Sequence, residues 1–131
     1  DSVAANATSP YEYIYGTIWL DIETNPSTGC SYSIRSFAEN CDFIQELVSA
    51  IQKRGRAVGI YATAYMWNQI LGDKNACPNF TKLPLWYAHY DSNANFDDWQ
   101  TSKFANWTQP TIKQYNGDSV ICGFQMDVDY F

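Results

Sequence analysis

The stretch Ile18-Trp19-Leu20-Asp21-Ile22-Glu23 is the segment around which the other parts of the chain are arranged. Apolar and polar residues alternate along it, which predicts a short β-strand with two different faces. The three aliphatic residues share the face that packs on a core, whereas Trp19, Asp21 and Glu23 share the other face. Carboxylates two residues apart on a strand lie about 6–7 Å from each other. Because each then changes the proton affinity of the other, we interpret this face as a candidate site.

The length and the charge of the chain limit its class and its partners. A chain of 131 residues is short enough for one domain. Aromatic residues make up 17% of it, which suits either a β-rich core or the stacking of sugar rings. The net charge is −6, and the densest basic group is Lys53-Arg54 with Arg56. We therefore expect no nucleic acid and no membrane as partners, and no apolar run is long enough to span a bilayer.

Cysteines and sequons indicate the compartment. The four cysteines, at positions 30, 41, 77 and 122, form no CxxC pair, and with His89 as the single histidine no zinc-ligand spacing arises. An even cysteine count suits two disulfides in an oxidising compartment. Three N-glycosylation sequons are present: Asn6-Ala7-Thr8, Asn79-Phe80-Thr81 and Asn106-Trp107-Thr108. Together these features predict a secreted glycoprotein. Because the chain starts at Asp1 without Met, we expect it to be processed, trimmed or a fragment.

Hydrophobic periodicity predicts alternating strands and helices after the first strand. Apolar residues at three- and four-residue spacing predict a helix over 36–54, with Asn40 as a candidate cap and Gly55 as its end. A short helix is predicted over 65–71 and a helical turn over 98–104. Further strands are predicted over 56–63, 83–90, 110–115 and 123–128. The βαβ order predicts a parallel sheet, whose five strands are too few to close a barrel of eight.

Five blocks of this sequence resemble the glycoside hydrolase family 25 lysozymes, the N,O-diacetylmuramidases, in order and spacing across residues 11–131. The blocks are Ile18–Glu23, Gly59-Ile60-Tyr61-Ala62, Leu85-Trp86-Tyr87-Ala88, Ile112-Lys113-Gln114-Tyr115 and Gln125-Met126-Asp127-Val128-Asp129. The resemblance implies an α/β fold, a partial TIM-like barrel of the irregular (β/α)5(β)3 type that lacks the first three β/α units. Residues 1–131 would then be a single, incomplete catalytic domain. An aspartate that the family places on its first strand would precede Asp1.

The resemblance also implies catalytic roles for three carboxylates. Glu23 is the expected general acid, because cleavage of a glycosidic bond needs a protonated carboxylic acid beside the leaving oxygen. Asp21 and Asp127 are the expected supporting carboxylates. Members of this family are similar to retaining enzymes in which the 2-acetamido group of the substrate acts as the nucleophile. No metal and no cofactor are implied.

Candidate substrate-binding residues lie in the same blocks: Tyr61, Trp86, Gln114, Gln125 and Asp129. An indole offers an apolar plate to a sugar ring, and a phenol can bond an acetamide carbonyl. The alternative for Tyr61 and Trp86 is packing in the barrel core, and for the two glutamines it is simple strand polarity. Family members often carry Asn where Asp129 stands, so its role is open. We expect Tyr115 in the core and His89 in a structural role, because no Ser/His/Asp or Cys/His arrangement is present.

Three pairings of the four cysteines are possible, and we expect Cys30–Cys41 and Cys77–Cys122. The first bond would tie the loop after the acidic strand to the following helix. The second would clip the loop before the third strand to the last hairpin.

The function implied by the resemblance is that of a monomeric lysozyme, secreted or lysosomal/phagosomal, in digestion or antibacterial defence. It would hydrolyse the β-1,4 bond between N-acetylmuramic acid and N-acetylglucosamine in bacterial peptidoglycan. One alternative is a sugar-binding module that retains an aromatic cleft without turnover. Another is a fragment with no function of its own.

Overall fold

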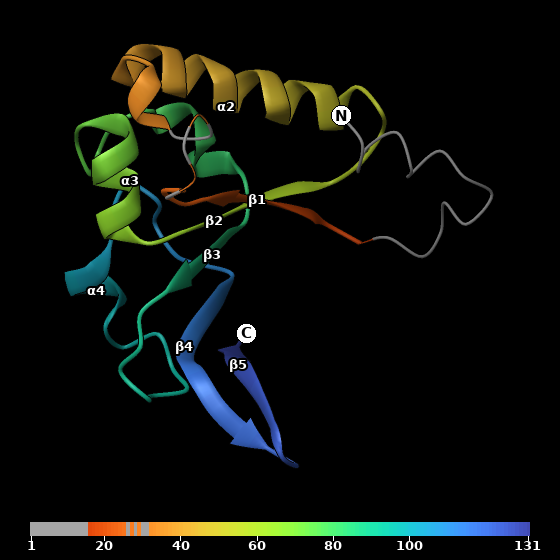
Figure 1. The fold of residues 1–131 in the computed structure, drawn as a ribbon, viewed down its shortest axis with the longest axis vertical. Helices are drawn as coiled ribbons and strands as arrows, with labels where there is room; N and C mark the ends of the chain where they lie inside the picture. Colours follow the sequence, from red (N-terminus) through yellow and green to blue (C-terminus); the bar gives the residue numbers. More distant parts are fainter. Residues whose placement is uncertain (1–15, 26, 28, 30–31) are drawn as a thin grey trace.

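The computed structural model describes residues 16–25, 27, 29 and 32–131 as a mixed α/β fold with one sheet (Figure 1). The strands are β1 (Ile18–Ile22), β2 (Val58–Ala62), β3 (Leu85–Ala88), β4 (Ile112–Ile121) and β5 (Phe124–Tyr130). The helices are α2 (Phe37–Gln52), α3 (Ala64–Leu71) and α4 (Trp99–Ser102), with short 3-10 helices η2 (Tyr32–Ile34) and η3 (Pro78–Lys82). Among these described helices, none has the length and apolar character needed to cross a membrane.

The sheet has the strand order of the chain, β1-β2-β3-β4-β5. Strands β1 to β4 are parallel, and β5 returns antiparallel to β4. Figure 1 shows α2 running along β1 and β2, while the β4–β5 hairpin extends away from the helices at the other end of the molecule. The curled sheet confirms the predicted α/β class and the predicted parallel order. It also brings the carboxyl ends of four strands to one edge, where such folds carry their sites.

The helix α2 begins one turn earlier than its candidate cap implied. Ser36 is the N-cap: its hydroxyl accepts a hydrogen bond from the backbone of Glu39, whose carboxylate accepts from the backbone of Ser36. This capping box satisfies two N–H groups of the first turn. Asn40, predicted as a cap, is buried, and its amide donates to the carbonyl of Ile70 at 2.8 Å. The prediction for Asn40 is wrong, because Asn40 joins α2 to α3.

The helix α3 follows the prediction from its local sequence. The side chain of Thr63 caps the first turn by accepting from the backbone of Met66. Gly72 ends the helix with φ +80°, a left-handed conformation that suits glycine. Behind the sheet, Trp67 of α3 packs edge-on against the rings of Phe80 and Trp107. This buried aromatic group, with the aliphatic face of the strands, forms the core that fixes the edge carrying the site.

The last two strands are longer than predicted. The sequence places a strand end at Tyr115, since Asn116, Gly117 and Asp118 are turn formers. In the structure β4 continues to Ile121 and accommodates these residues through two register shifts. The reversal occurs instead at Cys122-Gly123, where φ is +53° and +82°. Two successive positive φ angles are the geometry of a tight hairpin turn.

The expected cysteine pairing is wrong. Cys41 of α2 is bonded to Cys77, with their Cα atoms 6.0 Å apart. This bond excludes both Cys30–Cys41 and Cys77–Cys122. The physical reason is that α2 and α3 pack together, so the chain leaving α3 passes α2, whereas Cys122 is an exposed, free thiol at the hairpin turn. Cys30 lies outside the described residues.

Candidate active site

Two carboxyl groups lie where β1 ends. Asp21 is opposite Tyr61 of β2 in the sheet register, and Glu23 follows β1 directly. Partial burial raises the pKa of Asp21, although its side chain keeps solvent contact. Burial and then the negative charge of Asp21 raise the pKa of Glu23. A raised pKa keeps a carboxylic acid protonated closer to neutral pH, which is the property that a proton donor needs.

Three aromatic rings form a wall beside these carboxyl groups. The rings of Tyr61 and Trp86 are 5.0 Å apart between centroids and nearly perpendicular, at 73°. Trp19 meets Trp86 in the same way, at 5.7 Å and 79°. The indole of Trp19 lies across Gly59, where a Cβ atom would come within 2.4 Å of the ring. The position of Trp19 in this wall therefore requires a glycine in β2. The three rings lie on the same side of the sheet as Asp21.

Gln114 links the aromatic wall to a third carboxylate. This glutamine of β4 is only 4% exposed. Its carbonyl oxygen Oε1 accepts the hydroxyl of Tyr61 at 2.7 Å, and its amide Nε2 donates to Oδ2 of Asp127 at 3.0 Å. Burial, followed by the charges around it that include Glu23, strongly raises the pKa of Tyr61. The phenol stays neutral and can donate a hydrogen bond.

The two remaining candidates on β5 behave differently. Asp129 accepts a hydrogen bond from the indole Nε1 of Trp86 at 2.8 Å, and burial raises its pKa despite that bond. Gln125 donates to Asp118 at 2.7 Å near the exposed end of the hairpin. Asp129 thus belongs to the aromatic wall. Among the described residues, Gln125 has no hydrogen bond with Asp21, Glu23 or Asp127, and its role as a substrate ligand stays a prediction.

Tyr90 is a further candidate site residue that the sequence analysis missed. Its hydroxyl donates to the same Gln114 oxygen at 2.8 Å. Burial raises the pKa of Tyr90, a hydrogen bond with Tyr61 opposes this, and the charges of Asp127 and Glu23 add to the rise. The phenol of Tyr90 is therefore influenced by two of the three candidate catalytic carboxylates. The signal was present, because Tyr90 continues the two-residue period of Trp86 beyond the strand.

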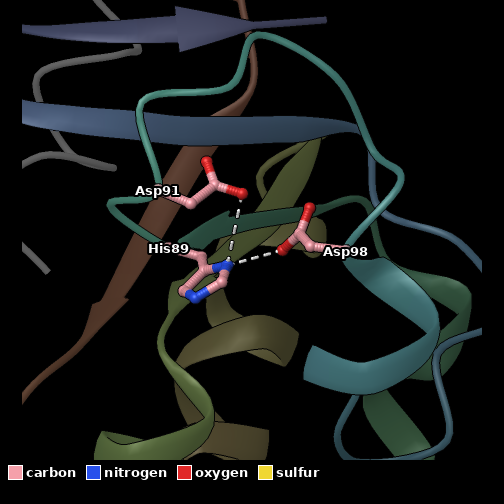
Figure 2. A group of neighbouring side chains, drawn as sticks. All are labelled: His89, Asp91 and Asp98. Carbon is pink, nitrogen blue, oxygen red and sulfur yellow. Dashed lines mark hydrogen bonds and ion pairs between the residues drawn. The ribbon is translucent and has the colours of Figure 1, made fainter.

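The single histidine lies in a separate polar cluster with Asp91 and Asp98 (Figure 2). His89 Nδ1 is 2.7 Å from Oδ2 of Asp98 and 3.8 Å from Oδ2 of Asp91. Their ligand atoms lie within 4.8 Å of one another, a spacing that a metal ion would accept. However, the ammonium of Lys113 already bonds both carboxylates. We therefore treat this cluster as an ion-pair network, which agrees with the structural role expected for His89.

Carboxylic acids at the carboxyl ends of parallel strands, beside an aromatic wall, are the arrangement of a glycoside hydrolase. The family model described as "Lysozyme-like protein 1" matches residues 2–115. The chain belongs to the glycoside hydrolase family 25 lysozymes.

Relatives and solved structures agree with this family. "Probable GH family 25 lysozyme 2" of Dictyostelium discoideum is 37% identical over 121 residues, which are 92% of this chain and 52% of that protein. "Counting factor 50" of the same organism is 34% identical over 117 residues, 89% of this chain and 36% of that protein. The bacterial lysozyme from Streptomyces coelicolor superimposes with a TM-score of 0.66 at 27% identity, covering 86% of this chain and 49% of that chain. The muramidase from Acremonium alcalophilum gives 0.65 at 28% identity, with the same coverage of 86% and 49%.

The chain thus spans about half the length, or less, of the proteins that it matches.

Proposed function

We propose that this protein hydrolyses the β-1,4 bond between N-acetylmuramic acid and N-acetylglucosamine in bacterial peptidoglycan. The observation that carries the proposal is the pair Asp21 and Glu23, with raised pKa values, on the side of the sheet that holds Tyr61 and Trp86. Glu23 donates its proton to the leaving oxygen as the glycosidic bond breaks. The aromatic wall binds the apolar faces of the sugar rings.

The reaction we propose retains the configuration at the anomeric carbon. The carbonyl oxygen of the 2-acetamido group forms a bond to that carbon as the leaving oxygen takes the proton of Glu23. Water then attacks the same carbon and gives a proton back to Glu23. This attack breaks the bond between the anomeric carbon and the acetamido oxygen and restores the acetamido group. Asp21 and Asp127 are the carboxylates available to orient and stabilise the acetamide during ring closure.

Analysis of the reaction products tests the proposed bond. Digested peptidoglycan is reduced with borohydride, and the newly formed reducing sugars are identified by mass spectrometry. Cleavage at the proposed bond leaves N-acetylmuramic acid as the reducing end. A reducing N-acetylglucosamine would instead assign the cut to the other glycosidic bond and overturn the proposed specificity. Binding without new reducing ends would support the sugar-binding alternative.

The pH profile tests the electrostatic coupling of the two acids. Glu23 must be protonated to act, so activity falls as pH rises through its pKa. The negative charge of Asp21 raises that pKa, and Asp21→Asn removes this charge. We expect the alkaline limb of the kcat/KM profile to move to lower pH in Asp21→Asn, by a fraction of a unit up to about one unit. Asp42→Asn is the matched control, because Asp42 is an exposed acid on α2. An unmoved limb in Asp21→Asn would contradict the coupling.

We further propose that the protein acts as a monomer outside the cytosol, secreted or in a lysosomal or phagosomal compartment. The bond between Cys41 and Cys77 supports an oxidising route of synthesis. The sequon residues Asn79 and Asn106 are both exposed, so attached glycans would not disturb the core. Asn79 lies before the start of β3 and Asn106 before the start of β4. Both therefore lie toward the amino ends of these strands, away from the carboxyl-end edge that carries Glu23.

A further inference from the structure

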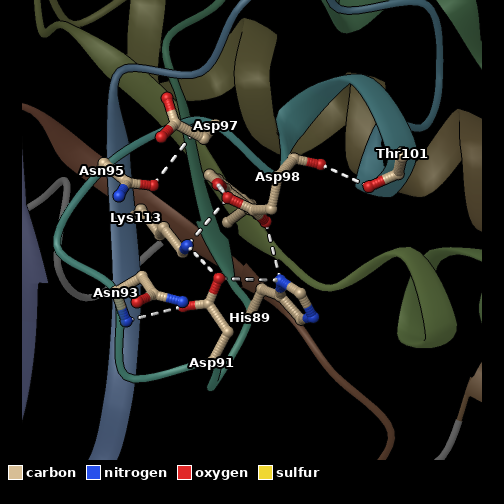
Figure 3. A network of polar contacts seen from close by, with 9 residues as sticks. His89, Asp91, Asn93, Asn95, Asp97, Asp98, Thr101 and Lys113 are labelled. Carbon is tan, nitrogen blue, oxygen red and sulfur yellow. Dashed lines mark hydrogen bonds and ion pairs between the residues drawn. The ribbon is translucent and has the colours of Figure 1, made fainter.

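Lys113 is a fully buried cation that holds the loop of residues 89–98 (Figure 3). Its Nζ lies 2.7 Å from Oδ2 of Asp91 and 2.8 Å from Oδ1 of Asp98. Burial opposes ionisation of Asp98, but hydrogen bonds from Lys113, Tyr87 and His89 lower its pKa to about 2. Burial likewise opposes the charge of Lys113, yet the two carboxylates raise its pKa. All three groups of this bridge are therefore charged at neutral pH.

The bridge anchors both ends of the loop to β4. Asp91 lies near the start of the loop and Asp98 at its end. Backbone bonds add to the first anchor: the N–H of His89 donates to the carbonyl of Gln114, and that of Ser92 to Tyr115, each at 3.0 Å. Tyr90 and Asp91 are the two residues between these backbone anchors, so the direction of Tyr90 is set from both sides.

Tyr90 points from this loop into the candidate active site. Its hydroxyl reaches Gln114 at 2.8 Å, and its ring passes over Gly117, where a Cβ atom would come within 2.7 Å of the ring. The side chain is nevertheless 60% exposed. A ring that is held at its hydroxyl and edge while most of its surface meets solvent is preorganised to stack on a ligand.

We propose that Tyr90 stacks on a sugar ring of the glycan and that Lys113, Asp91 and Asp98 are the positioning residues that hold it for this contact. This inference rests on the proposed function for its ligand. The positioning half rests on the ion pairs and does not depend on catalysis.

The first experiment compares Tyr90→Ala with Tyr90→Phe on a soluble tetrasaccharide of alternating N-acetylglucosamine and N-acetylmuramic acid. Tyr90→Ala removes the stacking surface, so we expect KM to rise about tenfold with kcat within about twofold. Tyr90→Phe keeps the ring and should stay within about threefold of the parent KM. Tyr65→Ala, which removes a tyrosine that is 66% exposed on α3, is the control. An unchanged KM in Tyr90→Ala, or an equal rise in Tyr90→Phe, overturns the stacking role.

The second experiment tests positioning through Asp91→Asn, which keeps the size of the side chain and removes its charge. Asp91 does not face the aromatic wall, yet we expect KM to rise several-fold. In the Tyr90→Ala background the same change should have no further effect, because both act through one ring. Asp97→Asn neutralises an exposed acid of the same loop and should leave KM unchanged. Additive effects of the first two changes would refute positioning.

Chemical acetylation of tyrosines separates this inference from the proposed function. With N-acetylimidazole and peptide mapping, Tyr90 should react more slowly than Tyr65 in the parent, because its hydroxyl is held by Gln114. Asp91→Asn should speed the acetylation of Tyr90 at least about threefold and leave Tyr65 unchanged. An unchanged rate at Tyr90 overturns the anchoring, whatever the activity. If the parent neither binds nor cleaves the glycan, the proposed function and the stacking contact fail together, while acetylation still decides the anchoring.

Discussion

Glu23→Gln is expected to reduce the hydrolysis of peptidoglycan about a hundred- to ten-thousandfold, because the amide keeps the shape of the side chain but has no proton to give to the leaving oxygen. The environment of Glu23 explains the size of the effect. Burial and then the charge of Asp21 raise its pKa, so Glu23 keeps its proton to a higher pH than an exposed glutamate does. The measurement is the initial rate of reducing-sugar release at the pH optimum of the parent.

Glu46→Gln is the matched control for this prediction. Glu46 is an exposed glutamate on α2, so the same chemical change there should leave the rate within about twofold. Binding of the glycan to Glu23→Gln should stay close to that of the parent, since the aromatic wall is untouched. A rate near that of the parent in Glu23→Gln would reject this residue as the acid. A loss of both binding and thermal stability would indicate a structural role instead.

The position of the acid pair follows from the sequence because its determinants are local. Alternation from Ile18 to Glu23 fixes one strand with one polar face, and side-chain period alone puts Asp21 and Glu23 together. The same holds for α3, because the helix ends at Gly72, a residue that the sequence itself marks as a helix end. Parallel pairing then follows from the βαβ order, so that Tyr61 and Trp86 come to the same side as the acids.

Features that depend on tertiary contacts did not follow from the sequence. The pairing of Cys41 with Cys77 requires the packing of α2 against α3, which no local pattern encodes. The two-residue period placed Gln125 on one strand face with Asp127 and Asp129. In the structure the register shifts of the hairpin leave Gln125 with Asp118 as its partner. Both register shifts put the extra residue in β4, so the two-residue period fails on the strand that supplies Asp118 and not on β5.

The burial of Lys113 also could not be predicted from the sequence, because it depends on charged partners in another segment. Lys113 stands in a short polar stretch of β4, where charge would indicate solvent exposure. Its partners are Asp91 and Asp98, 22 and 15 residues earlier in a segment that reads as a turn-rich loop. Only the fold places them within 3 Å. The part of the candidate site that the two-residue strand period determines was predictable from the sequence. The position of Tyr90 was not, because it depends on the conformation of the loop of residues 89–98.

Lys113→Met is expected to lower the free energy of unfolding by about 3–5 kcal/mol, because it leaves two carboxylates without their buried partner. The parent bridge brings Nζ to within 2.8 Å of both acids, and the lysine side chain is 0% exposed. The measurement is urea unfolding at pH 7. Lys103→Met is the control: this exposed lysine donates to Gln100 at 3.2 Å, and its loss should change stability by less than about 0.5 kcal/mol.

Replacing all three charged groups of the bridge separates two contributions to the free energy of unfolding: the destabilisation by an unpaired charge and the stabilisation by the ion pairs. The triple variant Lys113→Met, Asp91→Asn, Asp98→Asn should be more stable than Lys113→Met alone, because no half-buried carboxylate then lacks its cation. The pH dependence has a defined sign. The folded protein holds the pKa of Asp98 at about 2, below its ordinary 3.8, so the stability from Asp98 is present above about pH 4 and disappears as pH falls toward 2. The gap between the parent and Lys113→Met should close over that range. A gap independent of pH would mean that lost packing of the lysine stem, and not the ion pairs, makes Lys113 necessary.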